Sequence, residues 1–253
     1  MAISVHNSQR ELEQTPELLE RLQIKQKWFD FENWQLPYCE KQLFADAPGE
    51  FLLIMVLHGA GSVGKDNFLQ TRVPAEPLIR FLERFNIKSV VLMPQCDRGY
   101  QWVDVPWTST SHSLPETPSR YMSAALALLD SKSAGFQPKQ RAAIGISMGG
   151  YGVWDMACRR KFDLIGVMCG GADCQQAARF RDSRICIYHG EADNTVPVCR
   201  GRDMAEALKN AGCREFRYRE LPDTAHNVWD PFFFDGEALP YLFSDYCTFS
   251  PLN

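Results

Sequence analysis

The chain has 253 residues, of which 45% are apolar and 23% charged, and its formal net charge is -4. This composition is typical of a folded globular protein and excludes an extended disordered chain. The sequence has no basic stripe and no long block of one charge sign, so it predicts neither a nucleic-acid partner nor membrane-surface binding. It has no apolar run long enough to cross a bilayer and no signal-peptide core, so we expect a cytoplasmic protein.

The nine cysteines are scattered along the chain, and no two of them have CxxC spacing. An odd count without paired spacing favours neither a disulfide framework nor a zinc site. Several cysteines stand inside apolar runs and are expected to be small buried hydrophobic residues. The sequence therefore predicts no metal site and no cofactor.

The first 35 residues are expected to form an N-terminal helical extension, because the segment TPELLERLQIKQK has leucines at helical spacing. We expect this extension to pack on the surface of one domain that spans residues 1–253. No repeat, low-complexity tract or linker divides the sequence. The segment itself carries no pattern that indicates chemistry.

From residue 36 onward, short apolar runs alternate with helical patterns. Strands are expected at residues 36–44, 51–57, 89–93, 141–146, 164–169, 184–188 and 215–220. Helices are expected at residues 74–85, 119–131, 148–160 and 199–211. This alternation predicts a mostly parallel sheet flanked by helices, with functional groups at the carboxyl ends of the strands. The strand that ends at 169 is followed by the next after only 14 residues, which is too few for a large cap domain.

The strongest local motif is Gly145-Ile146-Ser147-Met148-Gly149, which lies between an apolar strand pattern and a helical pattern. This is G-x-S-x-G in the strand–turn–helix context that a nucleophilic serine requires. Side chains at positions 145 and 149 would clash in such a sharp turn. The turn raises the Ser147 hydroxyl to a helix N-terminus, where developing negative charge is favoured.

A serine hydroxyl needs a base, and in this chain order the histidine comes last with an acid before it. Of the two histidines after Ser147, only His226 leaves room for an acid on a separate strand end. Asp193, in the loop HGEADNTVP after a buried strand, is the preferred acid. Asp223 remains an alternative, although it is only three residues from His226 and could contact it locally.

The segment LHGAG follows another apolar strand and offers small residues at its carboxyl end. Acyl transfer needs two N–H donors aimed at the carbonyl oxygen as it becomes negative. The amide of Met148, next to the nucleophile, is predicted to supply one donor. Ala60 is predicted to supply the other, with Gly61 as the alternative.

Aromatic residues gather near the predicted site. A long loop after residue 93 holds Trp102 and Trp107. Tyr151 lies in the first turn of the helix expected after Ser147, and Trp229 lies three residues after His226. Large rigid side chains at these positions would offer stacking area for an aromatic or sugar group. The sequence predicts an open pocket lined by these four residues, with pinning of the long loop as the alternative role of its tryptophans.

Together, LHGAGSVGKDN, VVLMPQCDRGYQW, GISMGGYGVWDMA, HGEADNTVP and the closing H-x-x-W resemble the phospholipase/carboxylesterase-like ("predicted peptidase") esterase branch of the α/β-hydrolase superfamily. That branch is related to feruloyl-esterase-like enzymes, and the resemblance covers residues 36–235. It implies an eight-stranded, mostly parallel sheet flanked by helices. It also implies a triad of Ser147, Asp193 and His226, an oxyanion hole at Ala60 and Met148, and hydrolysis of carboxylic esters without a cofactor.

The expected function is cleavage of small or medium carboxylic esters, with acyl or feruloyl esters of carbohydrates as one candidate group. A serine peptidase or thioesterase would use the same triad, because substrate choice depends on the pocket. A non-catalytic binding protein of the same fold is a third alternative, and the presence of every catalytic element in the right order disfavours it. The sequence does not predict an oligomeric state.

Overall fold

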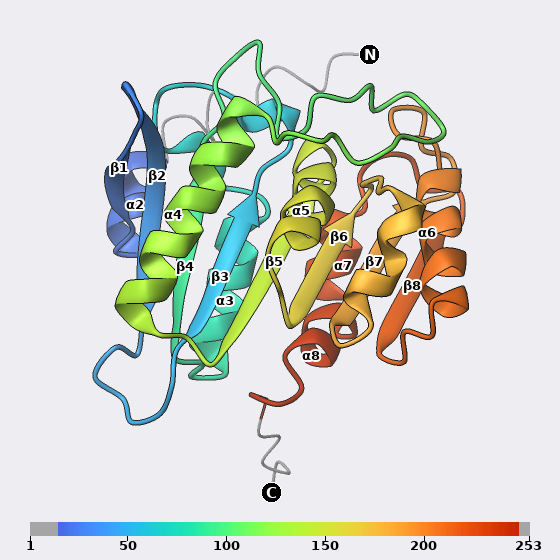
Figure 1. The fold of residues 1–253 in the computed structure, drawn as a ribbon. Helices are drawn as coiled ribbons and strands as arrows, with labels where there is room; N and C mark the ends of the chain where they lie inside the picture. Colours follow the sequence, from blue (N-terminus) through green and yellow to red (C-terminus); the bar gives the residue numbers. More distant parts are fainter. Residues whose placement is uncertain (1–14, 248–253) are drawn as a thin grey trace, which may run out of the picture.

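The computed structural model describes residues 15–247 of the chain. Eight strands form one sheet in the order β1-β2-β4-β3-β5-β6-β7-β8 (Figure 1). Strands β1 and β2 pair antiparallel with each other and β2 pairs antiparallel with β4, whereas the remaining pairs are parallel. The strands are β1 (Lys25–Phe31), β2 (Trp34–Leu43), β3 (Leu52–Leu57), β4 (Ser89–Pro94), β5 (Gln140–Ile146), β6 (Leu164–Met168), β7 (Arg184–Gly190) and β8 (Phe216–Leu221). The predicted eight-stranded, mostly parallel sheet is confirmed.

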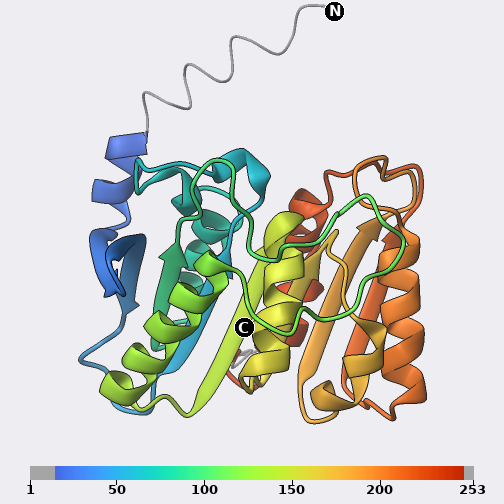
Figure 2. The same cartoon turned by 45° about the horizontal axis from the view of Figure 1, so that its top comes forward.

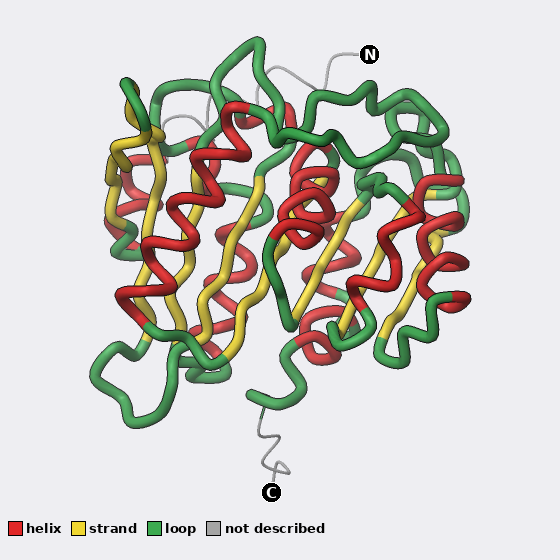
Figure 3. Tube along the Cα trace, in the orientation of Figure 1, coloured by secondary structure: helices red, strands yellow, loops and turns green. Residues whose placement is uncertain are grey.

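Helices cover both faces of the sheet, which is why the central strands are apolar on both sides (Figures 1 and 3). One face carries α4 (Arg120–Phe136), α5 (Met148–Arg159) and α6 (Cys199–Asn210), and the other carries α2 (Thr15–Arg21), α3 (Ala75–Arg84), α7 (Trp229–Phe234) and α8 (Ala238–Leu242). Strand β3, LLIMVL, is buried at every position. None of the helices in the described part of the chain is both long and apolar enough to span a membrane.

The N-terminal segment differs from the prediction of a helical extension. It contains helix α2 as expected, but Lys25–Phe31 form strand β1, which pairs with β2 and adds the eighth strand to the sheet. Lys27 on this strand donates to the buried carboxylate of Glu40 on β2 at 2.7 Å. The prediction is corrected for residues 25–31, which form an edge strand of the sheet, whereas its part at residues 1–14 lies outside the described residues.

No large cap interrupts the described chain between β6 and β7, as expected. The connection there holds only a short 3-10 helix, Cys174–Phe180. The long connection lies instead between β4 and α4, and its green trace crosses the top of the molecule above α5 toward α6 (Figure 2). Arg200 of α6 fixes its far end by donating to the carbonyl of Thr110 at 3.0 Å.

Candidate active site

Ser147 occupies the sharp turn between β5 and α5. Its backbone has φ 54° and ψ -120°, a conformation that a residue with a side chain rarely adopts. The turn is possible because its flanks are glycines: a Cβ at Gly145 would lie 2.3 Å from the carbonyl oxygen of Gly149, and a Cβ at Gly149 would lie 1.9 Å from that of Leu57. The strained backbone at Ser147 places the serine hydroxyl above the end of the sheet.

The imidazole of His226 joins the hydroxyl of Ser147 to the carboxylate of Asp193. His226 Nε2 lies 2.9 Å from Ser147 Oγ, and His226 Nδ1 lies 2.7 Å from Asp193 Oδ2. The structure thus brings together the three residues that the sequence singles out, from the carboxyl ends of β5, β7 and β8. With the proton on Nδ1 held by the carboxylate, Nε2 is free to accept the serine proton.

The Asp193 carboxylate is held on both oxygens, on Oδ1 by its own loop and on Oδ2 by the imidazole of His226. The backbone amides of Thr195 and Val196 donate to Oδ1 at 2.8 and 2.9 Å, while Oδ2 faces the imidazole. Burial alone would raise the pKa of this carboxyl. The hydrogen bonds from two imidazoles and two backbone amides outweigh burial and hold the pKa of Asp193 well below its usual range. The acid is therefore ionised wherever the protein is folded near neutral pH.

Close backbone packing brings the histidine loop to the acid loop. A Cβ at Gly190 would lie 2.1 Å from the carbonyl oxygen of Ala225, so only glycine allows this approach. The amide of Ala192 also donates to the carbonyl of Thr224 at 3.0 Å. Asp223, the alternative acid, is exposed, and Nδ1 of the imidazole is paired with Asp193 and not with Asp223.

The loop at Ala60 lies against the serine turn. A Cβ at Gly59 would be 3.7 Å from Ser147 Cβ, so the following residue starts beside the nucleophile. Ala60 opens a short 3-10 helix, Ala60–Ser62, and Met148 is the first residue of α5. Because the first N–H groups of a helix have no partner within the helix, these amides are the natural donors to an oxyanion.

A cavity of about 990 Å³ opens above Ser147 and His226. Trp107 and Trp229 line it, as predicted, and so do Gly59, Ala60 and Gly61. Part of its wall comes from segments to which the sequence assigned no role, namely α2, the residues just before α3 and the start of α3. Those wall residues are Glu17, Leu18, Arg21, Arg72, Val73 and Glu76. An ion pair of 3.3 Å between Arg21 and Glu76 joins the two helices across this wall.

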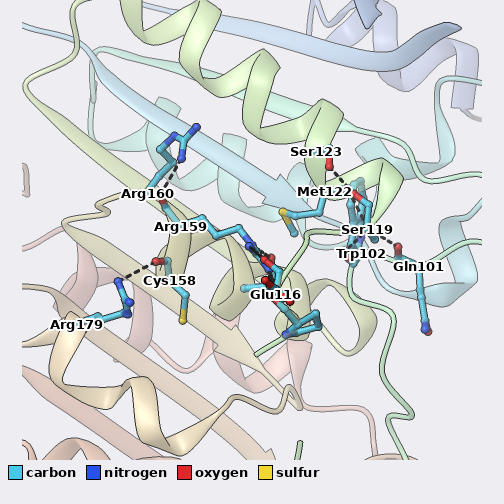
Figure 4. Close-up of polar contacts among 12 residues, drawn as sticks. Gln101, Trp102, Glu116, Ser119, Met122, Ser123, Cys158, Arg159, Arg160 and Arg179 are labelled. Atoms are coloured by element: carbon cyan, nitrogen blue, oxygen red, sulfur yellow. Dashed lines mark hydrogen bonds and ion pairs between the residues drawn. The ribbon is translucent and has the colours of Figure 1, made fainter. Parts of the chain in front are cut away.

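The other two predicted aromatic residues support the loop instead of facing the cavity. Trp102 is fully buried, and its indole N–H donates to the carbonyl of His58 at 3.0 Å. Ser119, at the start of α4, donates to the carbonyl of Trp102 at 2.8 Å (Figure 4). Tyr151 is also buried, and its hydroxyl donates to the carbonyl of Trp107 at 3.0 Å. The prediction that Trp102 and Tyr151 contact substrate is corrected, because neither side chain faces the cavity.

The sequence assigned no role at the site to two residues that lie beside Asp193 and His226. His189 is buried next to Asp193, and Cys169, with φ 48°, lies under His226 with its sulfur 3.4 Å from the carbonyl oxygen of that residue. Cys169, Asp193 and His226 place one ligand atom each within 4.8 Å of one another. A metal there would compete with the 2.7 Å Asp193–His226 hydrogen bond, and burial raises the pKa of the Cys169 thiol, which disfavours the thiolate that a metal needs. The donor set therefore suits proton transfer better than metal binding.

The chain belongs to the phospholipase/carboxylesterase family of α/β-hydrolases, whose family model matches residues 46–235. This match confirms the resemblance inferred from the motifs. A comparison with curated proteins found no match. The matched segment contains the hydrogen-bonded residues Ser147, His226 and Asp193 and both candidate oxyanion donors.

Solved structures share the fold. A crystal structure of a thermostable esterase is 26% identical with a TM-score of 0.78, and the alignment covers 87% of this chain and 62% of that one. This chain thus spans less than two thirds of that esterase. Est1E from Butyrivibrio proteoclasticus is 12% identical with a TM-score of 0.61, covering 87% and 98% of the two chains. The feruloyl esterase module from Clostridium thermocellum, an S954A mutant complexed with sinapinate, is 12% identical with a TM-score of 0.61, covering 87% of each.

Proposed function

We propose that this protein is a serine esterase that cleaves carboxylic esters through an acyl-enzyme on Ser147. The observation that carries the proposal is the unbroken hydrogen-bonded chain from Ser147 Oγ through His226 to Asp193 Oδ2, with distances of 2.9 and 2.7 Å. Membership of the phospholipase/carboxylesterase family supports the same reaction class. The proposed reaction steps follow from the positions of Ser147, His226 and Asp193.

In the first half-reaction, Ser147 Oγ attacks the ester carbonyl carbon while its proton passes to His226 Nε2. The carbonyl π electrons move to oxygen, and the resulting negative charge is stabilised by the amides of Ala60 and Met148. Asp193 stabilises the imidazolium and keeps it oriented. When the tetrahedral intermediate collapses, the bond to the alcohol oxygen breaks and the leaving alcohol takes the proton from His226 Nε2.

In the second half-reaction, water attacks the acyl carbon and gives its proton to His226 Nε2. A second oxyanion forms in the same place and collapses by breaking the bond to Ser147 Oγ. The serine recovers its proton from the imidazole, and the carboxylic acid leaves. Ser147, His226 and Asp193 return to their starting states and only the ester and one water are consumed, so the proposed cycle uses no cofactor.

The cavity favours esters with a small or medium acyl group, including aromatic acyl esters of carbohydrates. Trp107 and Trp229 supply flat apolar surface to the cavity, whereas the ion pair between Arg21 and Glu76 supplies polar surface. Such a combination suits a substrate with an aromatic or aliphatic part and a hydroxylated part. A panel of acetyl, butyryl, octanoyl and feruloyl esters, a thioester and a peptide would rank these substrates, and a peptide cleaved faster than every ester would overturn the assignment.

The direct test is labelling with a serine-reactive fluorophosphonate. We expect one equivalent of probe on the folded protein, and peptide mass spectrometry should locate it on Ser147. A matched control is Ser133→Ala, because Ser133 is a buried serine of α4 away from the cavity. Stoichiometric labelling of Ser147 that Ser133→Ala retains is expected; no labelling, or labelling of another serine, would refute the proposal.

A further inference from the structure

A second histidine lies on the far side of Asp193 from His226. His189 stands near the end of β7, and its side chain is completely buried. Its Nε2 atom lies 3.0 Å from the carbonyl oxygen of Val196 and 3.4 Å from Asp193 Oδ2. The imidazole therefore reaches both the loop that carries the acid and the acid itself, although it lines no part of the described cavity.

These contacts close a ring, in which two hydrogen bonds are joined by the 3.4 Å contact between His189 Nε2 and Asp193 Oδ2. Val196 donates its amide to Asp193 Oδ1 at 2.9 Å, while its carbonyl accepts from His189 Nε2. The oxygen Oδ2 then lies between two imidazoles, that of His226 at 2.7 Å and that of His189 at 3.4 Å. A carboxylate held in this way on both oxygens has little freedom to rotate about its own axis.

The surroundings select one tautomer of His189. Because Nε2 faces a carbonyl and a carboxylate, it must carry the proton. Nδ1 is buried and has no hydrogen-bond partner among the described residues. That side of the ring instead meets the backbone of α6, where a Cβ at Gly201 would lie 2.9 Å from Nδ1. The fold thus leaves a buried acceptor unpaired in order to present one N–H toward Asp193, a cost that an apolar residue would avoid.

We propose that His189 is a positioning residue for the hydrolysis: it fixes the Asp193 loop and carboxylate, and through them the orientation of His226. The inference rests on the proposed function. It assigns His189 no contact with substrate. Loss of its N–H would leave the carbonyl of Val196 without a buried donor and would loosen Asp193 Oδ2, so His226 would spend less time aligned with Ser147.

The consequence is an effect on the chemical step and not on binding. A misplacement of about 1 Å in a reacting group can cost on the order of a hundredfold in rate. Asp193 retains two backbone amides on Oδ1, so we expect a smaller loss in kcat, about tenfold. The KM for a short ester should stay within about twofold, because the cavity walls are unchanged.

A matched pair of variants tests this. Gln and Met are similar in length and shape, but only Gln can donate an N–H. His189→Met should lower kcat about tenfold, and His189→Gln should recover most of that loss, with both melting temperatures measured to confirm folding at the assay temperature. Equal kcat values for the two folded variants would overturn the proposal.

A double-mutant cycle separates positioning from general structural support. In an Asp193→Asn background, His189→Met should change kcat by less than about twofold, because the carboxylate through which it acts is already gone. A tenfold further loss there would refute the positioning role. If His189→Met fails to fold, ¹⁵N spectra of the wild-type histidines give the answer: a proton on Nε2 of His189 supports the proposal, and a proton on Nδ1 overturns it. Failure of wild-type ester hydrolysis itself would refute the proposed function instead.

Discussion

The Asp193 carboxylate depends on its surroundings as much as on its identity. Its side chain is fully buried, its two oxygens accept four contacts, and these contacts lower its pKa despite burial. Asp223, which is closer to His226 in sequence, is exposed and carries none of them. Sequence distance to a histidine therefore says little about which acid orients it, whereas a buried strand end that leads into a tight loop is informative.

The two aspartates should respond differently to the same substitution. Asp193→Asn removes the charge and presents an amide that favours the wrong tautomer of His226, so kcat should fall by about 10⁴-fold. Asp223→Asn should leave kcat within about twofold. Steady-state hydrolysis of a short ester measures both, and a larger loss for Asp223→Asn would mean that the wrong acid has been assigned.

At the scale of elements, the strand–turn–helix unit around Ser147 depends on backbones that nearly touch. Gly149 meets the carbonyl oxygen of Leu57 at the end of β3, and Gly150 meets Gly170 after β6. A side chain at either place would push the start of α5 away from the sheet. The same contacts hold the start of α5 against the end of β3 and the backbone of His58, so this packing also sets the position of the proposed oxyanion donor Met148.

A pair of glycine substitutions checks this. Gly149→Ala places a Cβ 1.9 Å from a backbone oxygen, so we expect destabilisation of about 3 kcal/mol or more, or failure to fold. Gly135→Ala, inside α4 with nothing within 4 Å of the new Cβ, should be neutral or should stabilise by about 0.5–1 kcal/mol. Urea unfolding measures both, and equal free energies of unfolding would contradict the packing argument.

Most elements could be predicted from the sequence because the central strands are continuous apolar runs bounded by glycine and polar residues. Strand β1, KQKWFDF, could not, because an edge strand with a largely exposed, charged face has no apolar periodicity. The three residues that the structure joins by hydrogen bonds, Ser147, His226 and Asp193, could be selected from the motif and the chain order. The supporting roles of Trp102 and Tyr151 could not be predicted. An aromatic residue in or beside a long loop can either hold the loop in place or face a ligand, and only the three-dimensional packing decides which.

At the scale of the whole molecule, the buried His58 and the half-buried His112 contact loops near the carboxyl ends of the strands. His58 is completely buried, and its Nε2 accepts from the amide of Cys96 at 2.9 Å. Burial lowers the pKa of His58 from 6.5 to about 4. His112, which accepts from Arg200, has its pKa lowered to about 4 by burial and by that guanidinium. Both side chains are therefore neutral in the folded protein at pH values where they are charged in the unfolded chain.

This difference predicts loss of stability in mild acid. A base whose folded pKa is depressed binds its proton more readily in the unfolded chain, so the free energy of unfolding should fall as pH drops from 6.5 toward 4 and level off below. Each group contributes a slope of at most about 1.4 kcal/mol per pH unit. Between pH 6.5 and 5 most carboxylates remain ionised in both states, so the histidines dominate there.

Urea unfolding at pH 6.5, 6.0, 5.5 and 5.0 measures the slope. His112→Gln keeps an acceptor for Arg200 but removes the titration, so its slope should be smaller than that of the wild type. Constant stability across this range, or an unchanged slope in His112→Gln, would contradict the linkage.

The hydroxyl of Ser147 is the one group without which the proposed cycle has no nucleophile, so its removal tests the central claim most directly. The measurement is kcat for a short-chain ester, with the melting temperature of the same preparation as control. For Ser147→Ala we predict a loss on the order of 10⁴-fold or more with the melting temperature within a few degrees of the wild type, because triad members act as a unit and the change removes a single partly exposed oxygen. Activity of folded Ser147→Ala within tenfold of the wild type would contradict the account.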